Sequence, residues 1–325
     1  MQKRMEQRRV RRTAPARAAT ATAEVRELAG WVTQALSRGF AGDVVVRTRE
    51  VMAAHQDAGP ASDLYLAAWL HLATALAQLG QHAEAVREYD GFIEAAGSAP
   101  GGEVMSLRAR LRRAGQLALL GRFDEAEAEC QLITEQCAQL PSAPAATAMR
   151  LIADNTRTIV LSGRGQHAEA ESLARSALRE ASSADLPPHG VTAFTVSLAR
   201  TLTAQQRYGE AELALRDLRP DGPAEIVTVA CGRAAARLGQ GRLREAEAGA
   251  RDALAAGERV LGPLHYTTLH AGTILGAALA RQGRHDEAER VLRANLTAWN
   301  AHFGPGHPRT TAAQEELART GAKPP

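Results

Sequence analysis

A six-residue pattern recurs six times between residues 80 and 288 and constrains the fold more than any other feature of this sequence. Each copy starts with Gly or Gln, has a ring or a large apolar side chain at its third position, and ends in Glu-Ala. The closing alanines are separated by 41, 44, 41, 35 and 42 residues. They are Ala85, Ala126, Ala170, Ala211, Ala246 and Ala288. A spacing in this range indicates an array of repeated structural units.

The residues around the pattern indicate that each unit is a pair of helices. A stretch of about 15 residues rich in Ala and Leu precedes each copy and predicts a first helix. Gly ends that helix because it adopts the left-handed conformation at little cost. Glu then lies in the first turn of a second helix, where its charge suits the helix dipole. We expect the small Ala to let the two helices approach closely, and the ring or apolar residue to fill the elbow between them.

These units resemble the tetratricopeptide repeat family. The first-helix pattern of that family, a large residue followed by Leu, a small residue and another large residue, is matched by Trp69, Leu72, Ala73 and Leu76. The period exceeds the 34 residues usual for this repeat, and two Gly-Pro-x-His segments begin at Gly262 and Gly304. Both features resemble the long-period variant found in kinesin light chains and in many bacterial proteins. The resemblance implies an all-α fold, a right-handed α-α superhelix of six to seven helix-turn-helix repeats with a C-terminal cap helix.

The repeats predict three parts of the chain. We expect a disordered basic arm over residues 1–23, the solenoid over 24–320, and a disordered tail over 321–325. The repeats are predicted near 24–58, 63–97, 103–140, 145–184, 188–219, 223–261 and 266–303, and the cap helix over 308–320. The repeat near 188–219 has Gln206 in place of Gly, and Arg219-Pro220 should cut its second helix short.

Charge is concentrated at the N-terminus. The chain has 39 Lys and Arg against 36 Asp and Glu, a net charge of +3. Residues 1–17 hold seven of the basic residues and one Glu, which is 7 − 1 = +6, so the other 308 residues sum to 3 − 6 = −3. Such an arm is either a solvated tail or a contact for nucleic acid or an acidic protein surface.

No pattern of residues predicts catalysis. The sequence has no glycine-rich phosphate loop, HExxH or GxSxG, so we expect no enzyme, no cofactor and no metal site. Three histidines (His82, His167, His285) share one repeat position, which indicates packing. Cys130 and Cys137 lie seven residues apart, on one face of a helix, and predict a packed pair.

Several features bear on where the protein works. No apolar run is long enough for a membrane helix, no secretory signal is evident, and the cysteines are odd in number. We therefore expect a cytoplasmic protein with no membrane partner. An Arg-rich composition with only two lysines indicates a high-GC genome, and with the resemblance suggests a bacterial, actinobacterial source.

The resemblance also implies where a ligand binds. First-helix side chains of such solenoids line a concave groove that binds peptides. The matching positions are Leu70, Thr74, Gln78, Arg108, Leu111, Asn155, Ile159, Val196, Arg200, Thr228, His270, Thr273 and Arg281. We expect a non-enzymatic scaffold or adaptor that binds a protein or peptide there. The alternative is a regulator that senses a peptide or small effector in transcription control, with the basic arm on DNA or an acidic partner. We expect nucleic-acid binding only through that arm, and the sequence leaves the oligomeric state open.

Overall fold

The computed structural model describes residues 23–36, 38–55, 63–97, 102–140, 143–183 and 188–321. Across these residues the regular elements are α-helices and no strand occurs, which confirms the all-α class. The first helix covers residues 23–36. The others are α2 (Ala41–Ala54), α3 (Asp63–Gln78), α4 (His82–Gly97), α5 (Glu103–Leu119), α6 (Phe123–Cys137), α7 (Ala143–Gly163), α8 (His167–Ser183), α9 (Pro188–Ala204), α10 (Tyr208–Arg216), α11 (Pro223–Gly239), α12 (Leu243–Val260), α13 (Tyr266–Arg281), α14 (His285–Phe303) and α15 (Pro308–Arg319). The predicted disordered arm and tail lie outside the described residues, apart from residues 23 and 321.

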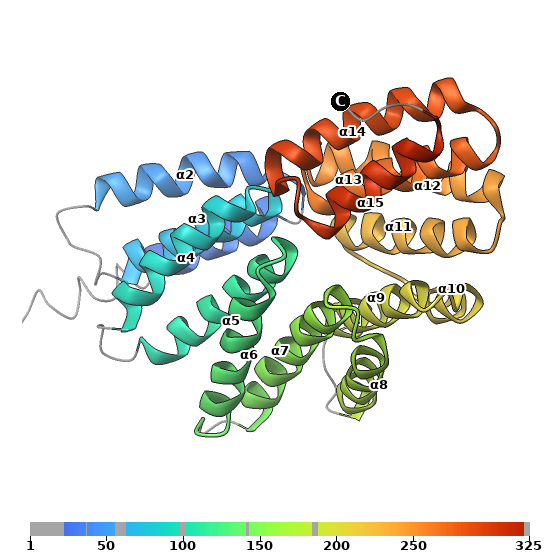
Figure 1. Cartoon of the computed structure of the whole chain (residues 1–325). Helices are drawn as coiled ribbons and strands as arrows, with labels where there is room; N and C mark the ends of the chain where they lie inside the picture. Colours follow the sequence, from blue (N-terminus) through green and yellow to red (C-terminus); the bar gives the residue numbers. More distant parts are fainter. Residues whose placement is uncertain are drawn as a thin grey trace, which may run out of the picture.

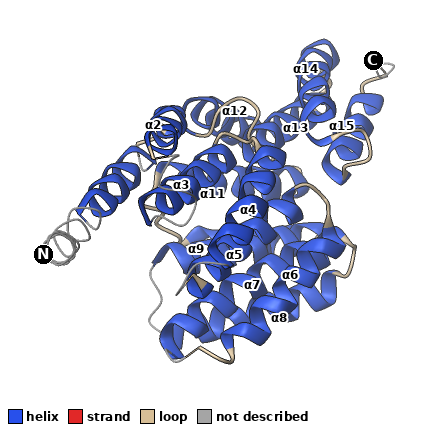
Figure 2. Ribbon diagram, turned by 90° about the vertical axis from the view of Figure 1, so that its left-hand side faces the viewer, coloured by secondary structure: helices blue, strands red, loops and turns tan. Residues whose placement is uncertain are grey.

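The helices stack in sequence order and form a superhelix. Each helix packs on the one that follows it, and α5, α7, α9, α11, α13 and α15, the first members of successive pairs, also pack on one another. Figure 1 shows the array curving so that α13–α15 return to the ends of α3 and α4, and Figure 2 shows the same helices from the side. The fold is therefore the predicted α-solenoid, and it is curved enough to bring its C-terminal helices beside its N-terminal ones.

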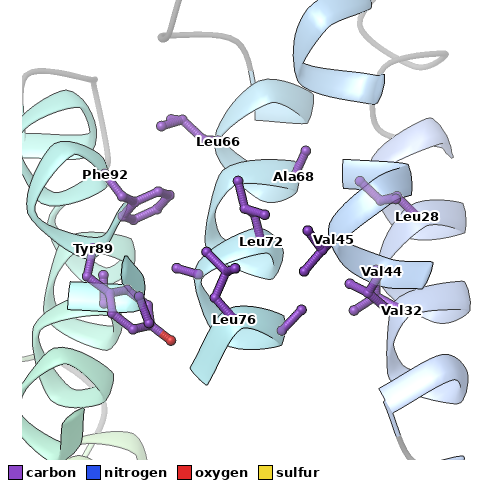
Figure 3. Packing of buried hydrophobic residues seen from close by; sticks show 14 of the residues in the cluster. Leu28, Val32, Val44, Val45, Leu66, Ala68, Leu72, Leu76, Tyr89 and Phe92 are labelled. Atoms are coloured by element: carbon purple, nitrogen blue, oxygen red, sulfur yellow. The ribbon is translucent and has the colours of Figure 1, made fainter. Parts of the chain in front are cut away.

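The core is a chain of clusters between neighbouring helices. In the N-terminal cluster, α3 lies between α2 and α4 and buries Leu72 and Leu76 at 3% and 1% exposure. Val44 of α2 packs on one side of α3 and Phe92 of α4 on the other (Figure 3). Each helix therefore buries its apolar face against sequence neighbours, as in other repeat proteins.

The repeated Gly and Ala have the predicted roles at the elbows. Each Gly that opens a copy of the pattern has a positive φ, between 75° and 80°, and Gln206 takes the same conformation with φ 62°. The closing Ala is fully buried in all six copies, with 0% exposure. Any larger side chain there would push the second helix away from the first. The short second helix predicted after Gln206 is α10, which has only nine residues.

The ring residues reach beyond the elbows in which they were expected to lie: Phe123 packs on Leu117 and Ala126 of its own pair and also contacts the next pair. Phe123 packs across on α7 of the next pair, where a Cβ at Gly163 would lie 2.3 Å from its ring. Tyr208 packs in the same way on Gly239 of α11, at 2.2 Å. His82 bonds through Nδ1 to Gln116 of α5, at 2.7 Å, whereas His285 is exposed. Phe123, Tyr208 and His82 therefore connect one pair to the next, and Gly163 and Gly239 make room for the rings of Phe123 and Tyr208.

A second polar contact joins successive pairs. A Glu directly after the buried Ala accepts hydrogen bonds from a Gln and an Arg at the following elbow. The same arrangement occurs three times, as Glu171 with Gln205 and Arg207, Glu212 with Gln240 and Arg242, and Glu247 with Gln282 and Arg284. Each of these Arg residues also binds the Glu three positions later in the sequence, in the first turn of its own helix.

Candidate ligand-binding site

The site depends on contacts between the two ends of the solenoid. The segment from Gly262 to His265 lies against the elbow between α3 and α4, where a Cβ on Gly80 would be 2.8 Å from the Cα of His265. The segment from Gly304 to His307 lies against the elbow between α5 and α6. There the His307 Nε2 and the carbonyl oxygen of Leu119 are 2.9 Å apart. The two Gly-Pro-x-His segments thus close the superhelix on itself.

The two histidines of these segments also begin helices. His265 Nδ1 accepts a hydrogen bond from the backbone N–H of Thr267 at the start of α13. His307 Nδ1 accepts one from the N–H of Arg309 at the start of α15. A ring nitrogen that accepts carries no proton, and the Leu119 carbonyl can only accept, so His307 is the neutral tautomer with hydrogen on Nε2. Burial lowers the pKa of His307, and burial with the nearby His82 lowers the pKa of His265 to about 3.

Closure leaves two adjacent cavities on the inner wall. One, of about 250 Å³, is lined by residues of α5, α6, α7, α9, α13 and α15 and by His307. The other, of about 160 Å³, is lined by α9, α11, α13 and Arg309 of α15. Four residues line both cavities: Arg200, Ala204, Tyr266 and Arg309. The inner wall therefore consists mainly of first helices, as the resemblance implies.

Tyr266 lies at the centre of a cationic cluster. Its phenol oxygen accepts hydrogen bonds from Arg200 Nη2 and from Arg309 Nε, each at 2.9 Å. Both guanidinium carbons also lie near the face of the phenol ring, 5.4 Å and 5.9 Å from its centroid. Burial opposes ionisation of Tyr266, but the charges of Arg200 and Arg309 outweigh it and lower the pKa of the phenol.

His270 holds Arg309 from the opposite side. Arg309 Nη1 and His270 Nε2 are 2.9 Å apart, and because a guanidinium only donates, Nε2 must be the acceptor. The hydrogen of His270 is then on Nδ1, which faces the thiol of Cys231 at 3.5 Å. Burial, and then the charges of Arg309 and Arg200, lower the pKa of His270 well below its usual value. Burial raises the pKa of Cys231 to about 12, so the thiol stays protonated.

A third cavity lies at the N-terminal end. Its volume is about 490 Å³, and it lies among the helix over residues 23–36, α2 and the start of α3. Glu24 and Glu27 line it together with Arg47 and His55, so both signs of charge are present. The cavities around Tyr266 differ because no Asp or Glu of the described residues lines them.

The structure brings together five of the predicted groove residues around Tyr266. These are Ile159, Val196, Arg200, Thr228 and His270. Three others make contacts within the protein itself. Leu111 is a core residue, and Arg281 pairs with Glu316. The Thr273 hydroxyl accepts hydrogen bonds from Asn295 and Trp299. Leu70, Thr74 and Gln78 are half-buried on α3, Arg108 is exposed on α5, and Asn155 lies on α7 with its side-chain oxygen buried and unbonded.

Two central residues of the cluster, Tyr266 and Arg309, were not among the predicted positions. Tyr266 is the first residue of α13, and Arg309 belongs to the helix expected to be only a cap. Both follow a His of a Gly-Pro-x-His segment, Tyr266 directly and Arg309 by two residues, and this position is the only sequence signal that could have identified them.

The predicted packing of the cysteines is confirmed, since Cys130 and Cys137 are buried in one cluster with Ile133. Burial raises the pKa of Cys130 to about 12. Within the described ranges, no group of three or more His, Cys, Asp or Glu could hold a metal ion. None of the described helices is long and apolar enough to cross a membrane.

Comparison with known proteins identifies the repeat. A tetratricopeptide-repeat family model matches residues 268–309, and a second model of the same repeat matches residues 66–90. The chain therefore contains tetratricopeptide repeats, and its architecture is that of a tetratricopeptide-repeat solenoid. No curated protein matches the sequence.

Solved structures of low sequence identity are similar to this chain, and those with a TM-score of 0.50 or more share its fold. A Rap protein crystallised in complex with Competence and Sporulation Factor is similar with a TM-score of 0.57 and 10% identity, over 93% of this chain and 99% of that one. A tetratricopeptide repeat protein from Parabacteroides merdae gives 0.50 and 16%, over 92% and 99%. A kinesin-light-chain-like repeat protein from Podosopora anserina gives 0.40 and 20%, over 60% and 95%.

Proposed function

We propose that this chain is a non-enzymatic scaffold that binds a peptide segment of a partner protein in the cavities around Tyr266. The observation that supports the proposal is the pair of adjoining cavities on the inner wall of the closed superhelix. First helices of successive repeats line them, and extended peptides bind to such continuous inner surfaces of solenoids. Cavities of about 250 and 160 Å³ suit individual side chains of a peptide.

The similar Rap protein was crystallised with Competence and Sporulation Factor. That complex concerns the Rap protein, and for this chain it supports only the idea that a solenoid of this shape accommodates a ligand. We place the protein in the cytoplasm as part of the same proposal, because the three cysteines are free and buried. The alternative of a DNA-linked regulator stays a prediction, since it depends on the basic arm, and residues 1–22 lie outside the described residues.

A selection with a substituted cavity tests the proposal. Short peptides displayed on phage are selected for binding to the full wild-type chain. Their affinities for the wild type and for Ala204→Trp are then compared. Ala204 is an exposed residue at the end of α9 that lines both cavities, so an indole there occupies the binding space without entering the core. The matched control is Ala255→Trp, at an exposed position of α12 that lines neither cavity.

The expected result is a set of peptides that bind the wild type and Ala255→Trp equally and bind Ala204→Trp at least tenfold more weakly. Circular dichroism establishes that both variants fold. A selection that yields no peptide, or only peptides that bind all three proteins alike, would contradict the proposal.

A further inference from the structure

Two arginines of the cavity wall have no carboxylate partner among the residues that the structure describes. Among the described residues, neither Arg200 nor Arg309 forms an ion pair, and no Asp or Glu lines either cavity. Other first-helix arginines behave differently: Arg113 binds Asp90, Arg157 binds Glu127, and Arg281 binds Glu316. The cluster thus places two positive charges side by side in a half-buried position, with no ion-paired carboxylate in the described part of the chain.

The neighbours of the two guanidiniums are neutral. Tyr266 accepts from both of them, and His270 accepts from Arg309 in its neutral form. These contacts use one N–H of Arg200 and two of Arg309, so each residue keeps further donors, and both residues line the two cavities. Both lone pairs of the phenol oxygen are occupied by the arginines, so its own hydrogen remains to be donated. No acceptor for that hydrogen occurs within the part of the chain that the structure describes.

We propose that Arg200, Arg309 and the hydroxyl of Tyr266 form a carboxylate-binding site, which holds an acidic side chain or the C-terminal carboxylate of the bound peptide. That the carboxylate belongs to a peptide rests on the proposed function. That an anion binds here is inferred from the cluster alone. A carboxylate has two oxygens that accept several hydrogen bonds, and guanidinium groups bind it in a fixed planar geometry. A positively charged cluster with spare donors, whose described lining includes no carboxylate, fits that ligand.

The site exists only in the closed superhelix. Arg200 is on α9, Tyr266 begins α13, and Arg309 lies in the first turn of α15. Arg309 is held in place by the turn that His307 caps, and His307 is fixed to Leu119. His270 is a positioning residue, because it touches Arg309 and lines only the smaller cavity.

A titration with small anions tests the site without a peptide. The side-chain Nε resonances of arginine are recorded by ¹⁵N NMR on the full chain and assigned with Arg200→Lys and Arg309→Lys. Succinate, inorganic phosphate and chloride are added at equal ionic strength. Succinate is expected to shift the Arg200 and Arg309 resonances saturably and to leave Arg281 unchanged. Shifts no larger than those with chloride would overturn the site, and saturable shifts with phosphate alone would overturn the choice of a carboxylate.

A second measurement uses the peptides from the selection described above. Each Glu or Asp is changed to Gln or Asn, and the C-terminus is amidated, one change at a time. One of these changes is expected to weaken binding to the wild type by about tenfold or more, as loss of a hydrogen-bonded charge does. The same change should have no effect in the double variant Arg200→Gln/Arg309→Gln, whereas Arg281→Gln should behave like the wild type.

The outcomes separate the two proposals. Peptides that lose binding to Ala204→Trp but tolerate every removal of a carboxylate would overturn the carboxylate site and leave the peptide groove standing. Saturable succinate shifts without any selected peptide would uphold the anion site and contradict the peptide groove.

Discussion

The ring of His307 and the carbonyl oxygen of Leu119, 188 positions apart in the sequence, share a hydrogen bond of 2.9 Å. The carbonyl belongs to the last turn of α5, and the same ring begins α15 by accepting from the N–H of Arg309. One side chain therefore caps the N-terminus of a helix in the C-terminal part and ties it to a helix of the N-terminal part.

Two substitutions separate these roles of His307. Asn is a good N-cap, so His307→Asn should keep the start of α15 but lose the bond to Leu119, whereas His307→Ala loses both. Each lost contact is expected to lower the free energy of unfolding by about 1 kcal/mol. Urea titrations of both variants give the two contributions, with exposed His302→Ala as control. Equal stability of all the variants would contradict the assigned roles.

Closure can be tested at Gly80. It has φ +78°, and a Cβ there would lie 2.8 Å from His265 Cα and 2.9 Å from His265 N. Gly165 has φ +80° at the equivalent elbow and no atom within 4 Å. Both Gly→Ala variants should lose about 1–2 kcal/mol because of the left-handed backbone. Gly80→Ala should lose more, because the backbone of His265 must move away.

Small-angle scattering provides a second measurement for the Gly80 variant. If the Gly262–His265 segment separates from the elbow, the radius of gyration increases in Gly80→Ala and stays unchanged in Gly165→Ala. Identical scattering and identical losses of stability in the two variants would mean that closure does not depend on this contact.

Mild acid should weaken the fold through its buried histidines. Burial lowers the pKa of His265 to about 3, and it lowers the pKa of His307 and of His270 as well. The unfolded chain binds these protons near pH 6.5. Their contribution to stability is therefore complete above pH 6.5 and is lost as the pH falls toward the folded-state values. Urea midpoints at pH 7.5, 6.0 and 5.0 should decrease in that order.

His265→Asn is the matched variant for this pH dependence. Asn keeps an oxygen that can accept from the Thr267 N–H but does not titrate. The decrease between pH 7.5 and 5.0 should be smaller in this variant than in the wild type. A wild-type profile that is flat over this range would contradict the prediction.

Gln206 is the one non-glycine residue with a positive φ among the described residues. Its side chain makes no described hydrogen bond, so Gly at this position would remove backbone strain without removing a contact. Gln206→Gly is expected to stabilise the protein by about 0.5–1 kcal/mol, the strain relief being partly offset by the greater freedom of Gly in the unfolded chain. Gln205→Gly, by contrast, should destabilise, because Gln205 binds Glu171.

The solenoid could be predicted because its determinants are local. Gly at the end of one helix and Glu-Ala in the next lie within six residues, so six copies of that spacing are enough to indicate stacked helix pairs. The pair-to-pair contacts were harder to predict, because the glycines that receive the rings of Phe123 and Tyr208 lie 40 and 31 residues further on. The sequence therefore predicts packing within one pair and does not predict the contact of these rings with the next pair.

The candidate site was predictable only in part, for the same reason. Arg200 and His270 occupy regular first-helix positions and were identified by position alone. Tyr266 and Arg309 enter the site because the superhelix closes, and closure depends on the accumulated curvature of all the pairs. No spacing within one repeat encodes that curvature. The selection with Ala204→Trp tests whether the predicted residues bind a peptide.

The Glu that joins successive pairs provides a last prediction. Glu247 accepts from Gln282, Arg251 and Arg284, and these hydrogen bonds lower its pKa to about 2. Its contribution is therefore present above the unfolded pKa, near 4.3, and is lost as the pH falls toward 2. Glu247→Gln should lower the free energy of unfolding by about 1–3 kcal/mol at pH 7, because charged hydrogen bonds are lost. The difference from the wild type should shrink in acid, and exposed Glu258→Gln should cost little at any pH. A cost for Glu247→Gln that is the same at pH 7 and pH 3 would show that the carboxylate charge does not hold this junction together.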